Sequence, residues 1–303
     1  MILALPAHAK LNLSLEVRGL QADGRHELST VFQAISLHDL LLAEPAPATE
    51  LVGGQQDDLV LRAQSALEAA TGRRLPARFR LVKRIPVGSG LGGGSSNAAA
   101  ALRALTAIYD LDLDLHPVAV KLGADVPFLL RGGTALAGGS GDELRELPGA
   151  SGCYAIAWPG FPISTPAVYR SWDQVGGEGE NHLQRAAFAV EPRLEAFARS
   201  LPGPGWRMTG SGSAFFKPFA RRREAQAAVA GLDCWTAVAV PVPANTWHSL
   251  RIDFQAARFS ASFNGKQLFE VEDSTFTDAG KVGLWTKADS VTLFDDVTYG
   301  ETK

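Results

Sequence analysis

The stretch GSGLGGGSSNAAAAL, residues 88–102, decides the fold and the chemistry expected of this chain. Five glycines occupy seven positions at 88–94, between a strand-like run and an alanine-rich helical run. Glycine lets the backbone approach a ligand closely, and the N–H groups and dipole of a helix start attract phosphate. The stretch therefore predicts a phosphate-binding loop. A structural alternative is a flexible loop in which Ser95, Ser96 or Asn97 caps the helix.

Two other nucleotide-binding motifs compare poorly with this stretch. The P-loop motif GxxxxGK[ST] needs a lysine directly after its second glycine, and this stretch contains no lysine. The dinucleotide motif GxGxxG does match Gly88, Gly90 and Gly93. However, the segment after the helix, DLDLDLH at 110–116, is charged and is not the apolar second strand of a dinucleotide fold. The dinucleotide interpretation thus stays open as a minor alternative.

Outward from the glycine cluster, strand-like and helix-like patterns alternate, which favours a mixed α/β architecture. Apolar residues alternate along LNLSLEV, as in a half-buried strand, and DGRHEL brings a turn at Asp23-Gly24. We expect strands at 11–17 and 77–87, helices at 60–70 and 98–109, and a helical stretch at 183–201 that Pro192 interrupts.

Length and composition limit the classes of protein to which the chain can belong. The 303 residues suffice for a sizeable core, and 29 basic against 32 acidic residues leave a net charge of −3 without a dense basic block. Nucleic-acid binding is therefore not expected. The two cysteines, Cys153 and Cys234, form no CxxC pair. Since neither a signal peptide nor a membrane span is apparent, we expect a cytoplasmic protein without a membrane partner.

Three further motifs carry side chains suited to chemistry. PAHAKLNLSLEV places Lys10 at a strand, where an exposed edge lysine is the commoner reason for such a residue. LGADVPFLL places Asp125 before Val126-Pro127, a pattern that by itself is typical of a helix N-cap. RMTGSGSAFF, residues 207–216, is a second glycine-rich turn.

Taken in chain order, these three motifs and the glycine-rich stretch 88–102 resemble the GHMP family of small-molecule kinases. The resemblance rests on PAHAKLNL, DGRHEL, KRIPVGSGLGGGSSNAAA, LGADVPFLL, PISTPAVY and RMTGSGSAFF, and covers residues 1 to about 242. It implies an α+β fold of two lobes, with an amino-terminal ATP-binding lobe at 1–145 and a carboxy-terminal lobe at 146–242. The site would lie between the lobes.

The resemblance also implies an activity. It is strongest to the family members that use ATP to phosphorylate the 2-hydroxyl of a cytidine diphosphate-linked methylerythritol, in the non-mevalonate route to isoprenoid precursors. The alternatives are another GHMP kinase acting on a small alcohol, such as homoserine or mevalonate, and a non-catalytic carbohydrate-binding fusion protein. The expected cofactors are ATP and Mg²⁺, with no metal ligands assigned.

Residue roles follow from the resemblance position by position. Asp125 would be the catalytic base, and Lys10 would hold it and stabilise charge on the transferred phosphoryl group. The residues expected to bind ATP are Leu59 and Lys83 at the adenosine, and Gly88, Gly90, Gly92, Gly93, Gly94, Ser95 and Ser96 at the phosphates. The residues expected to bind the phosphoryl acceptor are Asn12, His26 for the cytosine, Thr165, Tyr169, Gly210 and Gly212.

Two positions depart from the family pattern. Arg25 stands where the family has an aromatic residue against the cytosine, although a guanidinium can also stack on a ring. Asp58 stands in place of the usual asparagine near the adenine. Both departures concern affinity more than the type of reaction.

Composition changes near Pro243. Residues 243–303 hold nine of the 25 aromatic residues, four of the 31 glycines, and six basic against nine acidic residues. PVPAN at 241–245 is typical of a short linker, and the tail has the alternation of strands, with a hairpin expected at Asn264-Gly265. The tail resembles part of a concanavalin or laminin-G-like sandwich of the 3-keto-disaccharide hydrolase type, but at about 60 residues it is short for two sheets. We expect a partial β-segment that packs on the kinase or on another copy of the chain, with glycan binding as the lesser alternative. Its unpaired edges and aromatic residues predict self-association or aggregation if they are not covered.

Overall fold

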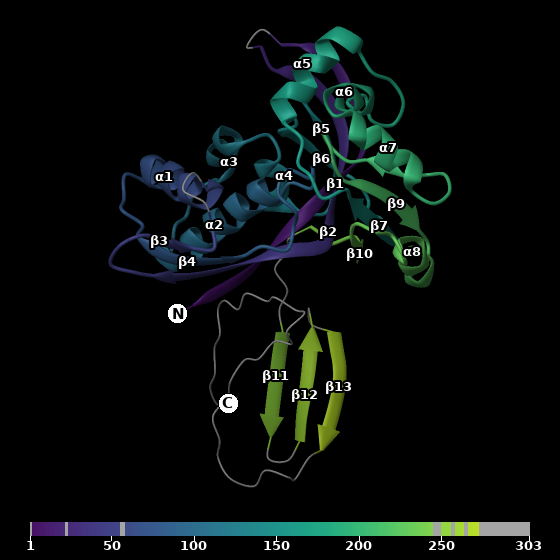
Figure 1. Cartoon of the computed structure of the whole chain (residues 1–303). Coiled ribbons are helices and arrows are strands. Elements are labelled where there is room, and N and C mark those ends of the chain that lie inside the picture. The colour runs from purple at the N-terminus through teal and green to yellow at the C-terminus, as the bar shows by residue number, and fades with distance from the viewer. Residues whose placement is uncertain are drawn as a thin grey trace. The chain divides into compact units, whose positions relative to one another are not determined.

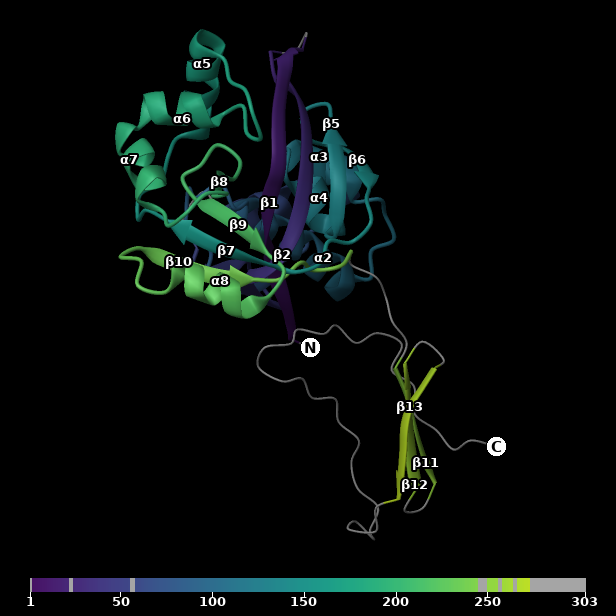
Figure 2. The same ribbon diagram turned by 90° about the vertical axis from the view of Figure 1, so that its right-hand side faces the viewer.

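The computed structural model describes residues 2–21, 24–54, 58–244, 250–255, 258–263 and 266–272. Residues up to Ala244 form one compact unit, and Asn245–Val291 form a second. In the first unit, a long antiparallel pair of strands runs between helices α1–α4 on one side and α5–α7 on the other (Figures 1 and 2). We call this pair the β1–β2 ribbon; it consists of β1 (Leu3–Leu20) and β2 (His26–Pro45).

The first sheet is built around this ribbon. Its order is β3-β4-β2-β5-β6, with β1 paired to β2, and all pairs are antiparallel except β3 with β4. The remaining strands are β3 (Glu50–Val52), β4 (Ala77–Val82), β5 (Thr134–Gly138) and β6 (Glu143–Glu146). Its helices are α1 (Leu59–Thr71), α2 (Gly93–Tyr109), α3 (His116–Leu122) and α4 (Val126–Arg131). A mainly antiparallel sheet excludes the dinucleotide fold, which requires parallel βαβ units.

A second sheet, ordered β10-β7-β9-β8, completes the first unit. Its strands are β7 (Cys153–Trp158), β8 (Arg207–Met208), β9 (Phe215–Phe219) and β10 (Trp235–Ala239). Its helices are α5 (Thr165–Val175), α6 (Gln184–Val190), α7 (Pro192–Ser200) and α8 (Arg222–Val229). Pro192 starts α7 at a position where its missing N–H costs nothing, so the predicted interruption of the helical stretch is confirmed.

Four apolar clusters hold these elements, and three of them fix the site. One packs α1–α4 against the first sheet, and another packs α5–α7 against the tip of the ribbon. The third lies between the sheets and contains Leu11 of β1, Ile85 and Leu91 with Ile156 of β7 and Phe216 of β9. Because Leu91 is fully buried there, the glycine-rich loop is anchored at its centre.

Two predicted boundaries are wrong. The strand expected over 77–87 ends at Val82, because the backbone N–H groups of Arg84 and Ile85 donate to the buried Asp39 carboxylate instead of to a neighbouring strand. The expected linker 241–245 is attached to the first unit as far as Ala244. Val242 donates a backbone hydrogen bond to Ala34, at 2.9 Å, and Ala244 is bridged to Gly132.

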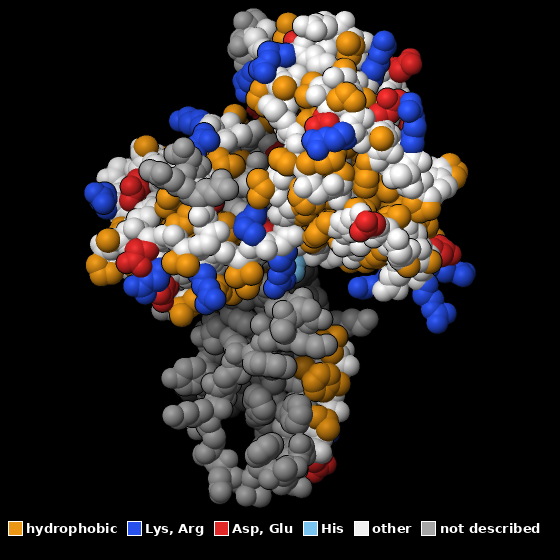
Figure 3. Space-filling model, in the orientation of Figure 1, with side chains coloured by type: hydrophobic (Ala, Val, Ile, Leu, Met, Phe, Trp, Pro, Cys, Tyr) orange, Lys and Arg blue, Asp and Glu red, His pale blue; other side chains and the backbone are white. Residues whose placement is uncertain are grey.

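The second unit is a three-stranded antiparallel sheet, β11 (Leu250–Gln255), β12 (Arg258–Phe263) and β13 (Lys266–Glu272). Phe263 pairs with Lys266, which agrees with the predicted hairpin, while Asn264-Gly265 and the strand-like segments from residue 273 onward lie outside the described residues. Figure 3 shows hydrophobic side chains exposed on β13, and Phe269 is 51% exposed. The sandwich expected for the tail is thus represented by a single sheet within the described residues.

Over the described part of the chain, the search for a helix of sufficient length and apolarity to cross a bilayer finds none.

Candidate active site

The centre of the site is built on β1 by simple strand alternation. Leu11 points into the apolar cluster between the sheets, so Lys10 and Asn12 point to the opposite face. Lys10 is only 4% exposed, and its Nζ donates a 2.6 Å hydrogen bond to Asn12 Oδ1. The Asn12 amide in turn donates to Thr30 Oγ1 on β2, at 2.8 Å. Lys10 is therefore a buried, oriented ammonium group, and the alternative of an exposed edge lysine is wrong.

Asp125 meets this lysine from the start of α4. It occupies the N-cap position, but its side chain makes no capping hydrogen bond. Its Oδ2 lies 3.3 Å from Lys10 Nζ, and the carboxylate is 28% exposed. Asp125 thus keeps one side toward solvent and the other toward a fixed positive charge, which is suitable for a group that exchanges a proton with a bound ligand.

Two glycine-rich turns close around Lys10. The loop 88–92 lies between β1 and the turn 209–213, with backbone hydrogen bonds from Lys10 to Leu91 and from Ala214 to Ser89, both 2.9 Å. A Cβ added at Gly90 would lie 2.4 Å from the Thr209 carbonyl oxygen, and one at Gly210 would lie 3.2 Å from Lys10 Nζ. Only glycine permits so close an approach of the turns to each other and to the lysine.

The helix after the loop starts earlier than the expected caps. It begins at Gly93 with Gly92 as N-cap, at a φ of 73° and without a side-chain cap, so Ser95 and Ser96 lie inside the first turn. The capping role expected for Ser95, Ser96 or Asn97 is therefore wrong. The first N–H groups of α2 lack both intrahelical acceptors and a side-chain cap, and this arrangement suits a bound anion.

Lys83 and Leu59 lie next to this helix start. A Cβ added at Gly93 would lie 3.3 Å from Lys83 Nζ, and one at Gly94 would lie 3.2 Å from a Leu59 methyl group. Lys83 is held in place by an ion pair with Asp39, which is fully buried. The buried carboxylate also accepts two backbone N–H groups, so the lysine beside the loop is positioned rather than loose.

The acceptor side of the site is formed by α5 and the start of β2. Thr165 and Ser211 share a 2.7 Å hydrogen bond between hydroxyl groups. The rings of Tyr169 and His26 lie 4.8 Å apart, and His26 Nε2 lies 2.7 Å from Asp173 Oδ1. Burial, and secondarily the charge of Asp125, raise the pKa of Tyr169 well above its usual range, so its hydroxyl keeps its proton.

The structure brings together Lys10, Asn12, Asp125, Gly92 and Gly210. Gly88 and Gly212 differ in their neighbours, since the atoms nearest to a Cβ added at either position belong to residues other than Lys10, Asn12 and Asp125. A Cβ at Gly88 would lie 2.4 Å from Pro162, and one at Gly212 would lie 2.9 Å from the Met208 sulfur. These two glycines serve the packing of the loops.

Sequence reasoning missed the polar residues that position the site. Thr209 accepts the backbone N–H of Asn12 at 2.9 Å, and Asn181 donates to the carbonyl groups of Met208 and Gly210. Thr209 and Ser211 stand inside the glycine-rich turn 207–216, where only the glycines were given a role. Thr30, Asp39, Asp173 and Asn181 stand in segments without a recognisable motif, so no local signal pointed to them. Among the described residues, no three His, Cys, Asp or Glu side chains gather as a metal site.

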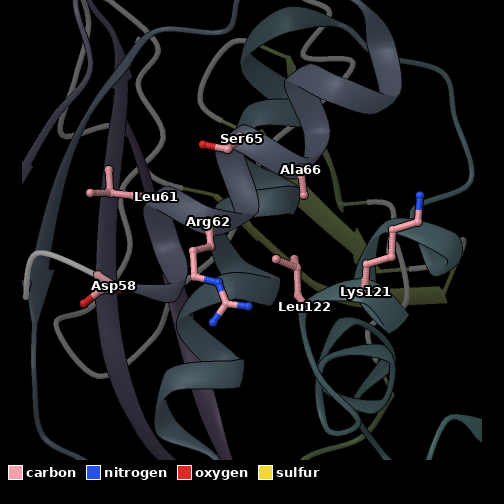
Figure 4. Close-up of a pocket in the computed structure, with 7 residues that line it drawn as sticks. All are labelled: Asp58, Leu61, Arg62, Ser65, Ala66, Lys121 and Leu122. Atoms are coloured by element: carbon pink, nitrogen blue, oxygen red, sulfur yellow. The ribbon is translucent and has the colours of Figure 1, made fainter. Parts of the chain in front are cut away.

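A separate hollow lies between α1 and α3. Figure 4 shows the seven residues that line it, and none of them is a predicted site residue: Asp58, Leu61, Arg62, Ser65, Ala66, Lys121 and Leu122. Asp58 is the N-cap of α1 and accepts the Val60 N–H at 2.9 Å. Since an asparagine could make the same bond, the departure at this position leaves α1 capped.

Comparisons with known proteins agree with this geometry. The family described as GHMP kinases N terminal domain matches residues 58–133. The 4-diphosphocytidyl-2-C-methyl-D-erythritol kinase of Xanthomonas axonopodis pv. citri is 38% identical over 263 residues, covering 77% of this chain and 89% of the relative. That of a Shewanella species is 37% identical over 251 residues, covering 75% and 88%.

Solved structures give the same result. A crystal structure of 4-(cytidine 5'-diphospho)-2C-methyl-D-erythritol kinase, 36% identical, has a TM-score of 0.67 and covers 78% of this chain and 99% of its own. Homoserine kinase from Cytophaga hutchinsonii, 18% identical with a TM-score of 0.58, covers 80% and 95% and shows the fold alone. The fold class and the family inferred from the motifs are thus confirmed. The chain belongs to the 4-diphosphocytidyl-2-C-methyl-D-erythritol kinase family of GHMP kinases and is a small-molecule kinase that uses ATP.

Proposed function

We propose that this chain transfers the γ-phosphoryl group of ATP to the 2-hydroxyl of 4-diphosphocytidyl-2-C-methyl-D-erythritol, a step of isoprenoid precursor synthesis. The observation that carries the proposal is the meeting of Lys10 and Asp125, 3.3 Å apart, beside two glycine-rich turns. Phosphoryl transfer needs positioning and charge stabilisation more than covalent chemistry. One carboxylate, one ammonium group and a backbone anion site are sufficient for it.

Asp125 acts as the general base in this proposal. Its carboxylate accepts the proton of the 2-hydroxyl as that oxygen bonds to the γ-phosphorus and the bond from this phosphorus to the bridging oxygen of ADP breaks. ADP leaves, and the proton stays on Asp125 until solvent takes it. Lys10 holds the carboxylate in place and presents its ammonium group to the negative charge on the transferred group. Asn12 keeps Lys10 from rotating away, because it accepts one of the three ammonium hydrogens.

The glycine-rich loop and the start of α2 bind the phosphates. The uncapped N–H groups of the first helical turn and the close approach of the backbone at Gly90 and Gly92 support this role. Mg²⁺ would offset the phosphate charge and be held mainly through the phosphate oxygens, as this ion commonly is. Lys83 and Leu59, which adjoin Gly93 and Gly94, would border the adenosine side.

The phosphoryl acceptor would lie on the other side of Lys10. His26 reads the cytosine, Tyr169 and Thr165 line the space between the base and the reacting hydroxyl, and the turn at Gly210–Gly212 borders the acceptor. The electrostatic influence of Asp125 on Tyr169 supports the proximity of these two parts. In this assignment 1–145 is the ATP-binding lobe, 146–242 is the acceptor lobe, and the tail 243–303 acts in self-association, with no nucleic-acid or membrane partner.

The test is release of ADP with and without the cytidine substrate. We expect turnover to require that substrate, and Asp125→Asn to lower kcat about 10²–10⁴-fold while ATP still binds. Asp112→Asn, a change at an exposed aspartate in the loop after α2, is the matched control and should turn over like the unaltered protein. Equal turnover with homoserine or mevalonate, or an active Asp125→Asn variant, would contradict the proposal.

A further inference from the structure

Helix α5 presents one row of side chains to the acceptor side of the site. Thr165, Tyr169 and Asp173 follow each other at four-residue spacing, so they lie on one face of the helix. Thr165 contacts the glycine-rich turn through Ser211, while Tyr169 and Asp173 both contact His26. The helix therefore connects the reacting end of the site to the base-recognition end, and Asp173 is the last member of the row.

The His26 imidazole is enclosed on three sides. Tyr169 lies against its face, with the rings tilted by 32°, and Trp172 meets it edge-on with centroids 5.6 Å apart. Asp173 Oδ1 lies 2.7 Å from Nε2, and the His26 side chain is only 12% exposed. The imidazole is thus held by three neighbours, while the Asp173 side chain is 39% exposed and meets it from the solvent side.

The hydrogen bond to Asp173 defines the protonation pattern of the ring. An ionised carboxylate offers acceptors only, so the proton in this bond belongs to Nε2. In the neutral ring Nδ1 is then a hydrogen-bond acceptor. Cytosine carries an amino group at N4 and is a donor there, whereas uracil carries a carbonyl oxygen at the same place. An acceptor at Nδ1 suits the first base and repels the second.

We propose that Asp173 is a positioning residue that holds His26 in the tautomer able to accept a hydrogen bond from the cytosine amino group, and so sets the preference for cytidine over uridine substrates. The inference rests on the proposed function, since it concerns the base of the proposed substrate. It adds Asp173 as the residue through which His26 acquires its selectivity. Arg25 and the other charged groups of the hairpin tip are not needed for it.

Asp173→Asn is the test, because an amide of the same shape can donate as well as accept and so releases the tautomer. We expect KM for the cytidine substrate to rise about tenfold, the ratio of kcat/KM for cytidine over uridine substrate to fall about tenfold, and kcat to stay within about twofold. The imidazole nitrogen shifts of His26 measured by NMR should move toward the other tautomer. Gln174→Ala, at the exposed neighbouring position, should change none of these quantities.

A second variant and a binding measurement make the result decisive. Asp173→Glu restores an acceptor-only partner and should recover part of the base preference. An unchanged cytidine to uridine ratio in Asp173→Asn, or a loss confined to kcat, would overturn the inference. If the unaltered protein does not turn over the cytidine substrate, the proposed function fails. Calorimetric titration with cytidine and uridine diphosphates, together with the NMR shifts, then still decides the role of Asp173.

Discussion

The middle and the tip of the β1–β2 ribbon each hold a pair of interacting side chains, Lys10 with Asp125 and His26 with Asp173, and the two pairs are built differently. In the middle, Lys10 and Asn12 are buried, and their partners come from β2, α4 and two glycine-rich turns. At the tip, His26 is held by neighbouring residues of the single helix α5. The middle is fixed by segments up to 197 residues apart in sequence, whereas the tip depends on one helix.

This difference separates chemistry from recognition. A centre enclosed by several elements keeps its geometry before and after the ligand binds, as charge stabilisation requires. A recognition end carried by one helix can change its side chains without disturbing that centre. Substitutions in the middle should therefore act on kcat, and substitutions at the tip should act on KM.

After Asp125→Asn, the largest effect is expected at Lys10. Lys10→Met keeps much of the apolar stem but removes the ammonium group that contacts both Asn12 and Asp125. We expect kcat to fall about 10²–10³-fold, as for the loss of one group that stabilises transition-state charge, with little change in KM for the cytidine substrate. Steady-state kinetics would measure both, and Lys121→Met, at an exposed position on α3, is the control. A change in KM alone would contradict the assignment of chemistry to the middle of the ribbon.

At the tip, Tyr169→Leu should have a smaller effect, and this effect should be on KM instead of kcat. The ring that lies 4.8 Å from His26 is lost, and an aromatic contact of this type contributes about 0.5–1.5 kcal/mol. We expect KM for the cytidine substrate to rise about threefold to tenfold, with kcat nearly unchanged. Tyr169→Phe keeps the ring and should behave like the unaltered protein. A kcat loss as large as that of Lys10→Met would show that the tip takes part in chemistry.

The sequence was a good guide where local patterns decide the structure. The glycine cluster 88–94 predicted a loop that other backbone segments approach closely, and the structure has such a loop. Periodicity predicted the helix α2 and the strand at 11–17. The early start of α2 was missed, because its N-cap is Gly92 in a left-handed conformation and not the serines that capping preferences favour.

What the sequence did not reveal depends on strand register and loop packing. The pairing of Lys10 with Asp125 spans 115 residues, and only the family resemblance suggested it. Thr30 and Asp39 both lie on β2, where Thr30 contacts Asn12 and Asp39 contacts Lys83. No local sequence pattern connects either of these pairs. Asp125 shows the limit most clearly, since it stands at an N-cap position and yet leaves the helix uncapped in order to contact Lys10.

The β1–β2 ribbon also contains a histidine with a purely structural role, His8 on β1. Burial, then the neighbouring charges of His38 and Arg103, lower the pKa of His8 from 6.5 to about 4, although its Nδ1 also contacts the Ile35 carbonyl at 3.2 Å. The unfolded chain takes up a proton near pH 6.5 and the folded protein only near pH 4, so stability falls as the pH drops through this window. At pH 5 the loss amounts to about 2 kcal/mol relative to pH 8.

His8→Asn removes this titration and keeps a donor for Ile35. We expect the free energy of unfolding of the variant, followed by urea denaturation, to decline about 2 kcal/mol less between pH 8 and pH 5 than that of the unaltered protein. The comparison of slopes cancels any fixed cost of the substitution and the shared titration of carboxylates. Parallel pH profiles would show that His8 is protonated in the folded protein, as a histidine in contact with solvent would be.

The smallest effect on catalysis is expected from removing the tail. The apolar clusters of the first unit draw on residues up to Val242, and the last described contact of that unit is the bridge from Ala244 to Gly132. A chain ending at Ala244 keeps both, so kcat/KM should stay within about twofold of the full-length value. The middle and the tip of the ribbon would then be shown to act without the second unit.

The same truncation should change association. In β13, Phe269 and Val271 are two residues apart and so lie on one face of the second sheet, and both side chains are exposed there. A single three-stranded sheet must cover such a face to be stable, and a second copy of the chain would do so. Sedimentation should show the full chain associating with rising concentration and the truncated chain remaining monomeric. A truncated protein that folds but loses kcat would instead show that the tail supports the site, and the separation of chemistry from recognition would then have to include a third region.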